Sequence, residues 1–292
     1  MILMCRQKYF AVSPSQLSKI ITVAVALALS CLLTAPTLAD TAATPPKLQV
    51  SDRDSILRAL LWLRTSGEYE ALCLQTFSTA LAHVRNVVRS SSAGKDAKPP
   101  AVVMDLDETV LDTSGYSMHL LSNGLKHHEA HWLSWNREHL DEIGLVPGAR
   151  QFIKDVESEG VYVVFISNRP DAGRDGTIQV LRKFDLATQA ALRDPNGIKL
   201  LLRANTSSKQ SRRDKVNDKY TVIALLGDNL NDFSDDFREP SVNSIDQRRA
   251  MVRKHAAEWG SRWYVLPNPI YGNWMRYIDW NNAGQYLQRP AR

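Results

Sequence analysis

Apolar residues along the chain change between helical and strand spacing. From Asp52 to Arg89 they recur every three or four positions, which predicts two helices interrupted near Ser66 and Gly67. Further along, short uninterrupted apolar runs are typical of strands buried on both faces of a parallel sheet. These runs cover residues 101–104, 161–166, 198–202 and 221–226.

Helical patterns separate these apolar runs. They cover residues 149–159, 177–184 and about 209–215. Strands that alternate with helices predict an α/β fold with a Rossmann-like, doubly wound parallel sheet and right-handed crossovers. Residues 233–253 are polar and are expected to form a loop followed by a helix, and a late strand is expected at 263–266.

Residues 113–146 interrupt the alternation of strands and helices. The segment is too long for a simple connection and too aromatic for a solvated linker. We therefore expect it to form a small, mostly helical cap over the ends of the strands, inserted in a domain that runs from 52 to 292. A cap of this kind can select a substrate and exclude water.

The first 39 residues resemble an export signal. Three basic residues precede an apolar stretch at 20–33, and Ala39 is the kind of small residue that signal peptidases cut after. We predict a signal peptide at 1–39 and a flexible leader at 40–51, hence a periplasmic or secreted protein. An uncleaved anchor helix is the alternative.

Cys31 offers a lipid anchor as another alternative. The residues before it, Ala28, Leu29 and Ser30, lack the leucine usual three positions before a lipidated cysteine. An outer-membrane lipoprotein is therefore not our first expectation, and membrane contact is expected only if Cys31 is lipidated. After cleavage at Ala39 only Cys73 remains, which excludes an internal disulfide.

The net charge of the chain limits the classes of binding partner that we expect. The full chain of 292 residues carries a net charge of +5, and loss of three basic residues with the signal lowers it to +2. A nearly neutral mature protein does not call for binding to polymeric nucleic acid.

Polar clusters follow three of the predicted strands. Asp105 and Asp107 come after the first, Ser167-Asn168-Arg169 after the second, and Gly227-Asp228-Asn229 after the last. Since parallel strands end at one edge of the sheet, where ligands bind, these side chains should meet there. Ionised carboxylates are costly to bring together without a cation, so the clusters predict a Mg²⁺ site.

This set of residues suits phosphoryl transfer. Asp105 is placed as a nucleophile that forms an aspartyl phosphate, and Asp107 as the acid and base. Asp228 would complete the Mg²⁺ site with Asp105 and a backbone carbonyl. Ser167 and Asn168 could donate hydrogen bonds to the phosphoryl group, and a lysine near the third strand end would neutralise charge.

At these residues the chain resembles the haloacid dehalogenase (HAD) superfamily, and more closely its class C acid phosphatases, which include the e(P4) type 5′-nucleotidases. The resemblance covers about residues 55–275. It rests on Asp105-Leu106-Asp107-Glu108-Thr109, on the run Gly227–Phe233, and on shorter matches. These shorter matches include Ser66–Tyr69, Val146–Ala149, Gly176–Ile178 and Pro267–Pro269 with Tyr271-Gly272.

The resemblance implies roles for particular residues. Asp105 would be the nucleophile and Asp107 the acid and base, with the carbonyl of Asp107 joining Asp105 and Asp228 on Mg²⁺. Asp232 would support the metal from outside its ligand set. For the phosphate-binding lysine we choose Lys209, because Ser208-Lys209 and Arg212 match the spacing of the family, and we keep Lys215 as the second choice.

Aromatic residues suggest the substrate. Trp132, Trp135, Tyr271 and Trp274 could stack on a nucleobase or nicotinamide ring, although packing in the core or rim is the alternative for each. The resemblance favours Tyr271 and one cap tryptophan. A zinc site is not expected, because the histidines of the cap match no known ligand spacing. They are His119, His127, His128 and His131.

The sequence thus predicts a secreted, Mg²⁺-dependent acid phosphatase acting on small phosphomonoesters, with nucleoside 5′-monophosphates or nicotinamide mononucleotide preferred. Three alternatives stay open: a phosphatase without base preference, a phosphotransferase, and a noncatalytic storage or binding protein of the same fold. A homodimer is also left open.

Overall fold

The computed structural model describes residues 52–91, 97–187, 191–192 and 198–287. All of them belong to one structural unit, Leu48–Arg292. The expected signal peptide, the leader and Cys31 lie outside the described residues. Among the helices of the described part, none combines the length and apolarity needed to cross a bilayer.

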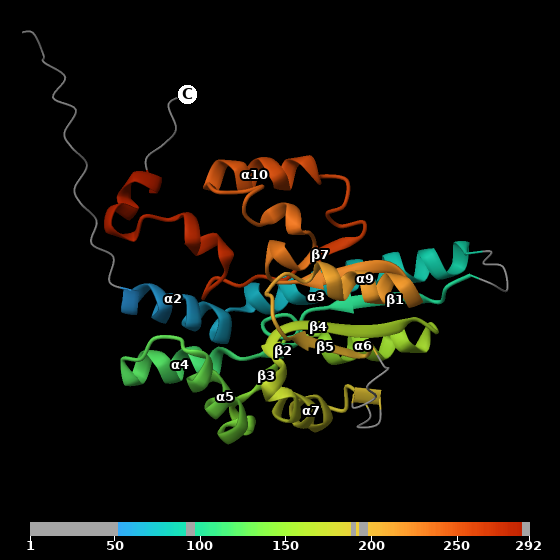
Figure 1. Cartoon of the computed structure of the whole chain (residues 1–292), viewed down its shortest axis with the longest axis horizontal. Helices are drawn as coiled ribbons and strands as arrows, with labels where there is room; N and C mark the ends of the chain where they lie inside the picture. Colours follow the sequence, from blue (N-terminus) through green and yellow to red (C-terminus); the bar gives the residue numbers. More distant parts are fainter. Residues whose placement is uncertain (1–51, 92–96, 188–190, 193–197, 288–292) are drawn as a thin grey trace, which may run out of the picture. The chain divides into compact units, whose positions relative to one another are not determined.

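Five parallel strands form the central sheet, in the order β5-β4-β1-β6-β7 (Figure 1). Strand β1 lies in the middle, where Val103 pairs with Val164 of β4 on one side and Leu225 of β6 on the other. The doubly wound α/β fold expected from the sequence is confirmed. The strands are β1 (Pro100–Met104), β4 (Tyr162–Pro170), β5 (Leu200–Arg203), β6 (Thr221–Gly227) and β7 (Trp263–Val265).

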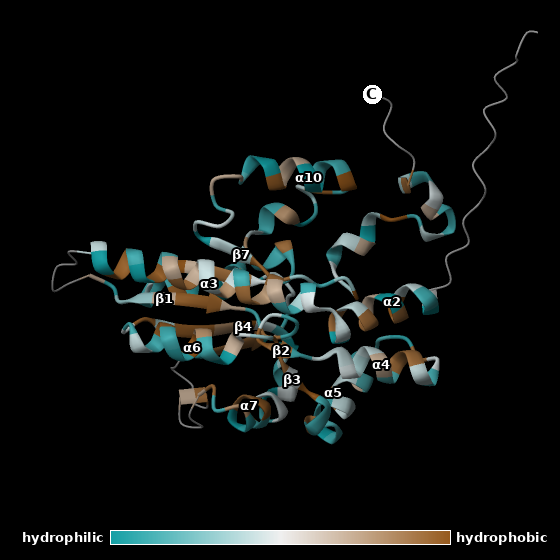
Figure 2. Ribbon diagram, turned by 180° about the vertical axis from the view of Figure 1, so that it is seen from behind, coloured by the Kyte–Doolittle hydropathy of each residue, from teal (hydrophilic) through white to brown (hydrophobic). Residues whose placement is uncertain are grey.

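Helices cover both faces of this sheet because successive strand residues point to opposite sides. Val102 and Met104 pack in the same cluster as residues of α3 and α6, whereas Val103 packs with Val216 of α9. Figure 2 shows the result as hydrophobic colouring along β1 and β4 between helices of mixed polarity. These helices are α3 (Gly67–Ser90), α6 (Ala149–Ser158), α7 (Arg174–Lys183), α9 (Gln210–Lys219) and α10 (Ile245–Lys254).

The expected break near Ser66 is confirmed. Helix α2 (Asp52–Thr65) ends one residue before it, and Ser66 caps α3 by accepting the backbone N–H of Tyr69 at 3.1 Å. A serine at this position satisfies one of the donors that the first turn leaves free, and Glu68 and Glu70 favour the positive end of the helix dipole.

The segment expected to form a cap leaves and re-enters the core through a second, two-stranded sheet. In it, Leu111 pairs with Leu145 and Asp112 with Gly144 in antiparallel register. Between them lie two helices and a 3-10 turn. The elements are β2 (Leu111–Asp112), α4 (Ser114–Asn123), α5 (Glu129–Glu138), η1 (Leu140–Glu142) and β3 (Gly144–Leu145).

Strand β4 is longer than the sequence predicts. The prediction ended it at Ile166 and placed Ser167 to Arg169 in the loop beyond. In the structure β4 continues to Pro170, which pairs with Arg203 of β5 across a register shift. Ser167 and Arg169 are buried while Asn168 is exposed, so the polar cluster alternates between faces as strand residues do.

After β6 the chain forms short 3-10 turns before and after α10 and β7. Turn η3 follows the strand directly, and η5 carries the last residues that matter for the site. The bounds are η3 (Leu230–Asp232), η4 (Asp235–Phe237), η5 (Asn273–Tyr277) and η6 (Trp280–Leu287).

Candidate active site

A tight loop after β1 presents the two aspartates. The N–H of Asp105 donates to Leu226 of β6 at 3.0 Å, which continues the sheet by one residue. The carbonyl of Leu106 then accepts the N–H groups of Thr109, Val110 and Leu111 at 3.3, 2.8 and 2.8 Å. This folding back places the loop over the carboxyl end of the sheet, as the sequence predicts.

Glu108 closes that loop. Its φ of 56° is a left-handed conformation that few residues other than glycine adopt. Its Oε1 accepts the hydroxyl and N–H of Thr113 at 2.6 and 3.1 Å, where the cap begins. The side chain is buried and Oε2 has no hydrogen-bond partner. Burial, followed by the charges of Asp107 and Asp228, raises the pKa of Glu108 well above its usual value.

Lys209 lies between two aspartates. Its Nζ is 2.5 Å from Oδ1 of Asp105 and 2.7 Å from Oδ1 of Asp232, and its side chain is 4% exposed. Burial opposes its charge, but Asp105 and Asp232 outweigh this effect and raise the pKa of Lys209. Lys215, the second choice from sequence, is exposed on α9. The structure thus brings Lys209, and not Lys215, to the nucleophile position.

Three carboxylates meet at this point. Asp105, Asp228 and Asp232 each offer an oxygen within 4.8 Å of the others. Burial, then Asp232 and Asp105, raises the pKa of Asp228 well above its usual value. Burial also raises the pKa of Asp105 to about 7, which the neighbouring aspartates reinforce and Lys209 counteracts. Lys209 is the one cation that pairs with Asp105 and Asp232 in the part of the chain that the structure describes, so negative charge is in excess.

The cluster fits the magnesium that the sequence predicts. Hard carboxylate oxygens are the donors Mg²⁺ prefers, and an excess of buried negative charge is what a divalent cation would neutralise. Oδ1 of Asp228 accepts the Thr109 hydroxyl at 3.4 Å and Oδ2 accepts the amide of Asn268 at 2.8 Å. Oδ2 of Asp232 accepts the N–H of Asn229 at 3.0 Å, so both of its oxygens are already engaged.

Asp107 has a cation of its own. Arg169 donates from Nε to Oδ1 and Oδ2 at 3.0 and 3.1 Å, and from Nη2 to Oδ1 at 2.7 Å. The Arg169 side chain is 1% exposed, against 20% for the Asp107 side chain. The sequence singled out Arg169 only as part of a polar cluster and gave it no role.

Ser167 and Asn168 are held by hydrogen bonds from three arginines. Oγ of Ser167 accepts the N–H of Arg169 at 3.1 Å, and a serine that accepts one bond can still donate its own hydrogen. Arg212 donates to the Ser167 carbonyl at 2.6 Å and to Oδ1 of Asn168 at 2.7 Å. Its hold on Oδ1 leaves the amide N–H groups of Asn168 as donors. Arg203 also binds the Asn168 carbonyl, at 3.0 Å.

The stacking prediction for Trp132 and Trp135 needs correction. Both rings are buried, Trp132 to 9% and Trp135 to 2% exposure. They stack on each other, with centroids 5.8 Å apart, and both contact Tyr116 of α4. The guanidinium carbon of Arg169 lies 5.1 Å from the Trp132 ring centroid. Packing between the two cap helices uses these surfaces, as large aromatic side chains bury the most area.

Tyr271 and Trp274 are placed differently. They are 40% and 38% exposed, and the Trp274 ring lies over Gly272, where a Cβ would come within 2.9 Å of it. Oδ1 of Asn268 accepts the N–H groups of Ile270 and Tyr271 at 3.0 and 3.4 Å. Since Nδ2 of the same side chain binds Asp228, one amide connects the aromatic segment to the acidic cluster.

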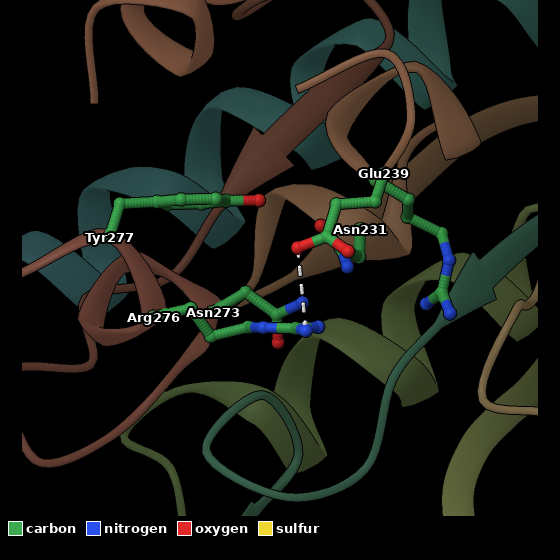
Figure 3. Close-up of a pocket in the computed structure, with 6 residues that line it drawn as sticks. Asn231, Glu239, Asn273, Arg276 and Tyr277 are labelled. Carbon is green, nitrogen blue, oxygen red and sulfur yellow. Dashed lines mark ion pairs between the residues drawn. The ribbon is translucent and has the colours of Figure 1, made fainter. Parts of the chain in front are cut away.

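A polar pocket of about 250 Å³ lies beside η3 (Figure 3). Arg276 and Glu239 face each other across it at 3.4 Å. Oδ1 of Asn273, which lines the pocket, accepts a hydrogen bond from Nδ2 of Asn229 at 3.4 Å. Asn229 follows Asp228 directly in the sequence. The full lining is Asn231, Arg238, Glu239, Asn273, Arg276 and Tyr277.

The cap histidines form contacts of other kinds. Nδ1 of His127 lies 3.2 Å from the Tyr116 hydroxyl, and the rings of His128 and His131 are 5.6 Å apart. Within residues 52–91, 97–187, 191–192 and 198–287, the one group of side chains close enough to share a metal ion is the aspartate cluster.

Comparison with known proteins gives the same assignment. Residues 43–274 match the family model described as HAD superfamily, subfamily IIIB (acid phosphatase). The class C acid phosphatase from Bacillus anthracis is 32% identical over 77% of this chain and 88% of its own, with a TM-score of 0.66. The same protein with tungstate bound is 31% identical over 79% and 90%, with a TM-score of 0.67.

The match extends over the core, the cap and the segment of Tyr271, so the aspartate cluster, Lys209 and Arg169 all fall within it. The similarity is also well above the level at which only a fold is shared. The chain therefore belongs to the acid phosphatases of the HAD superfamily, subfamily IIIB, which hydrolyse phosphoric monoesters.

Proposed function

We propose that the protein is a Mg²⁺-dependent phosphatase that passes the phosphoryl group through Asp105, with nucleoside 5′-monophosphates or nicotinamide mononucleotide as preferred substrates. The observation that supports this most is the arrangement of Asp105, Asp228 and Asp232 around a single buried lysine. When bound, the ion would neutralise these carboxylates and the oxygens of the phosphate.

The residues of the chain divide the work. Asp105 attacks phosphorus, and Asp107 gives a proton to the leaving oxygen and later takes one from the attacking water. Asp105, Asp228 and the backbone carbonyl of Asp107 would hold the ion, and the Asp107 carboxylate is paired with Arg169 instead. Asp232 keeps Lys209 in place from outside this set.

We assign Lys209, Ser167 and Asn168 as donors for the phosphoryl oxygens. Lys209 contacts the nucleophile directly, and the Ser167 hydroxyl and Asn168 amide are set by Arg169 and Arg212. Such preorganised donors stabilise the charge that develops as phosphorus is transferred. The tungstate found in the Bacillus anthracis relative is consistent with an oxyanion site in this family.

The preference for nucleotides is supported by the segment after β7. Tyr271 and Trp274 offer exposed rings, and Asn268 holds this segment against Asp228. Aromatic faces bind planar bases with little regard to their identity, so nucleotides of different bases should all be substrates. Export to the periplasm or the medium, inferred from residues 1–39, gives the activity a role in salvage of phosphoesters that cross membranes poorly.

A panel of phosphate-release assays tests this proposal. The mature protein, from Asp40 onward, is compared with Asp105→Asn on nitrophenyl phosphate, nucleoside monophosphates and glycerol phosphate, with Mg²⁺ or EDTA. We expect release that needs both Asp105 and Mg²⁺. Absence of release from every substrate would favour the storage or binding alternative, and transfer to added alcohols would favour the phosphotransferase.

Tyr271→Ala tests the substrate preference separately. It should raise KM for nucleotides by about tenfold, as expected for loss of a stacking contact of 1–3 kcal/mol, and leave glycerol phosphate unaffected. Equal effects on both substrates would support the alternative of a phosphatase without base preference.

A further inference from the structure

Arg169 is a buried cation that the roles described so far leave unexplained. Its three guanidinium nitrogens donate to three side chains, and the Arg169 side chain is almost fully enclosed. Nε and Nη2 bind Asp107, while Nη1 donates to Oδ1 of Asn136 at 2.9 Å and to Oγ1 of Thr177 at 3.4 Å. A buried arginine with such commitments fixes whatever it contacts.

The contact with Asp107 is unequal between its two oxygens. Oδ1 accepts both Nε at 3.0 Å and Nη2 at 2.7 Å, whereas Oδ2 receives only a shared contact from Nε at 3.1 Å. A proton on Oδ1 would point at two N–H donors. Oδ2 is therefore the oxygen that can carry the proton, and Arg169 sets the direction in which it faces.

The other side of the guanidinium is held by the cap. Asn136 and Trp132 both belong to α5, and Asn136 is 3% exposed. The position of the Asn136 side chain in turn depends on the absence of a side chain at Gly176 of α7, where a Cβ would come within 2.7 Å of Nδ2 of Asn136. A shift of α5 would thus reach Asp107 through the side chain of Arg169. Arg169 and Asp107 are 62 positions apart in the sequence.

We propose that Arg169 is a positioning residue that aims Oδ2 of Asp107 at the leaving oxygen, and that the cap controls this aim through Asn136 and Trp132. The inference rests on the proposed function. In the step concerned, Asp105 forms a bond to phosphorus, and the bond from phosphorus to the ester oxygen breaks with its electron pair staying on that oxygen. The proton of Asp107 Oδ2 moves to the same oxygen.

This role has a signature that a merely structural one lacks. An alkoxide is a poor leaving group and needs the proton of Asp107, whereas nitrophenolate is stable enough to leave without it. Misaiming Oδ2 should therefore slow transfer from alkyl phosphates much more than from nitrophenyl phosphate. The constant to compare is kcat/KM, because it covers the steps up to transfer to Asp105 and leaves out the later attack of water.

Arg169→Lys is the primary variant, because it keeps the charge but loses the fork that grips Oδ1 and reaches Asn136. We expect kcat/KM to fall about 100-fold for glycerol phosphate and nucleoside monophosphates, in line with loss of general acid catalysis, and less than about fivefold for nitrophenyl phosphate. Arg174→Lys is the matched control: this arginine lies nearby but pairs with Asp171 at the surface, and its variant should leave all substrates unaffected.

Two variants, one in the cap helix α5 and one in α7, test the transmission without touching Asp107. Asn136→Ala removes the acceptor for Nη1 of Arg169. Gly176→Ala adds a Cβ that displaces the Asn136 side chain. Both should show the same dependence on the leaving group with a smaller loss, about tenfold for alkyl phosphates. The effects of Arg169→Lys and Asn136→Ala should be less than additive, because they act on one contact.

Equal losses of kcat/KM for alkyl and nitrophenyl phosphates, or no loss in any variant, would overturn the inference. If Arg169→Lys does not fold, as judged by circular dichroism, Asn136→Ala and Gly176→Ala decide it by the same ratio of losses. Failure of the proposed function would look different, since the wild-type protein with Mg²⁺ would then release no phosphate from either class of substrate.

Discussion

Replacing the nucleophile should stabilise the protein when no metal is bound. Asp105 lies within 4.8 Å of Asp228 and Asp232 in a buried cluster where Lys209 supplies one positive charge. Without a divalent cation, the ionised form of Asp105 is therefore unfavourable in the folded state. Asp105→Asn removes that charge while keeping the shape of the side chain.

The pKa of Asp105 gives the sign and the size of the effect. Burial raises it from 3.8 to about 7 in the folded protein. Between these values the folded state binds more protons than the unfolded state, so the stability is full below about pH 4 and declines as the pH rises to about 7. A difference of about 3 in pKa corresponds to about 4 kcal/mol. The side chain is 12% exposed, so solvent screens little of this.

Urea denaturation in EDTA, followed by the fluorescence of the seven tryptophans, measures this difference. At pH 4 the variant and the wild type should have equal free energies of unfolding. At pH 8 Asp105→Asn should be more stable by about 2–4 kcal/mol. Mg²⁺ should narrow this difference at pH 8, since it stabilises the wild type by about 2.7 kcal/mol at 100 times its Kd and the variant by less.

Asp218→Asn, an exposed carboxylate of α9, is the control and should change nothing at either pH. The reasoning fails if Asp105→Asn is less stable than the wild type at pH 8 in EDTA. It also fails if the gain is as large at pH 4, because the protonated aspartic acid is neutral there and should behave like asparagine.

Three further predictions follow from single side chains. Lys209→Met should lower phosphate release about 100-fold or more, while Lys215→Met retains the activity; similar losses would refute the choice between them. Phe165→Ala, at a position with no exposure in β4, should cost about 3–5 kcal/mol of unfolding free energy in urea titrations. Tyr162→Ala, 52% exposed in the same strand, should cost less than about 1 kcal/mol, and equal costs would contradict the packing argument. Asn268→Ala should weaken Mg²⁺ binding about tenfold in calorimetry, and an unchanged Kd would separate this amide from the metal site.

The sequence predicted what depends on local pattern. The apolar runs before Asp105 and Asp228 are strands because each is buried on both faces, and both aspartates lie where parallel strands end. The apolar spacing predicted a helix break near Ser66, and the Ser66 hydroxyl that caps α3 at this break acts within one turn. Lys209 was preferred to Lys215 because Ser208, Lys209 and Arg212 resemble the spacing of the family, and the geometry places Lys209 beside Asp105.

Contacts made across the fold were not predicted. The pairing of Arg169 with Asp107 joins residues 62 positions apart, and no local signal marks which buried arginine meets which carboxylate. The extension of β4 to Pro170 depends on a partner strand with a register shift. Trp132 and Trp135 were proposed to stack on the substrate because the sequence does not distinguish an aromatic residue of the core from one that lines a binding slot. Their packing against Tyr116 shows that they belong to the core of the cap.

The pairing of β2 with β3 has a consequence for how this enzyme can diversify. Asp112 and Gly144 are neighbours in an antiparallel ladder. Residues 113–143 therefore leave the core and return to it at the same place, where the two strands pair through their backbones. A segment with joined ends can change in length at little entropic cost, or shrink to a hairpin turn. Recombination could therefore join a new cap to the same catalytic core, provided that the new cap supplies a hydrogen-bond partner for Arg169.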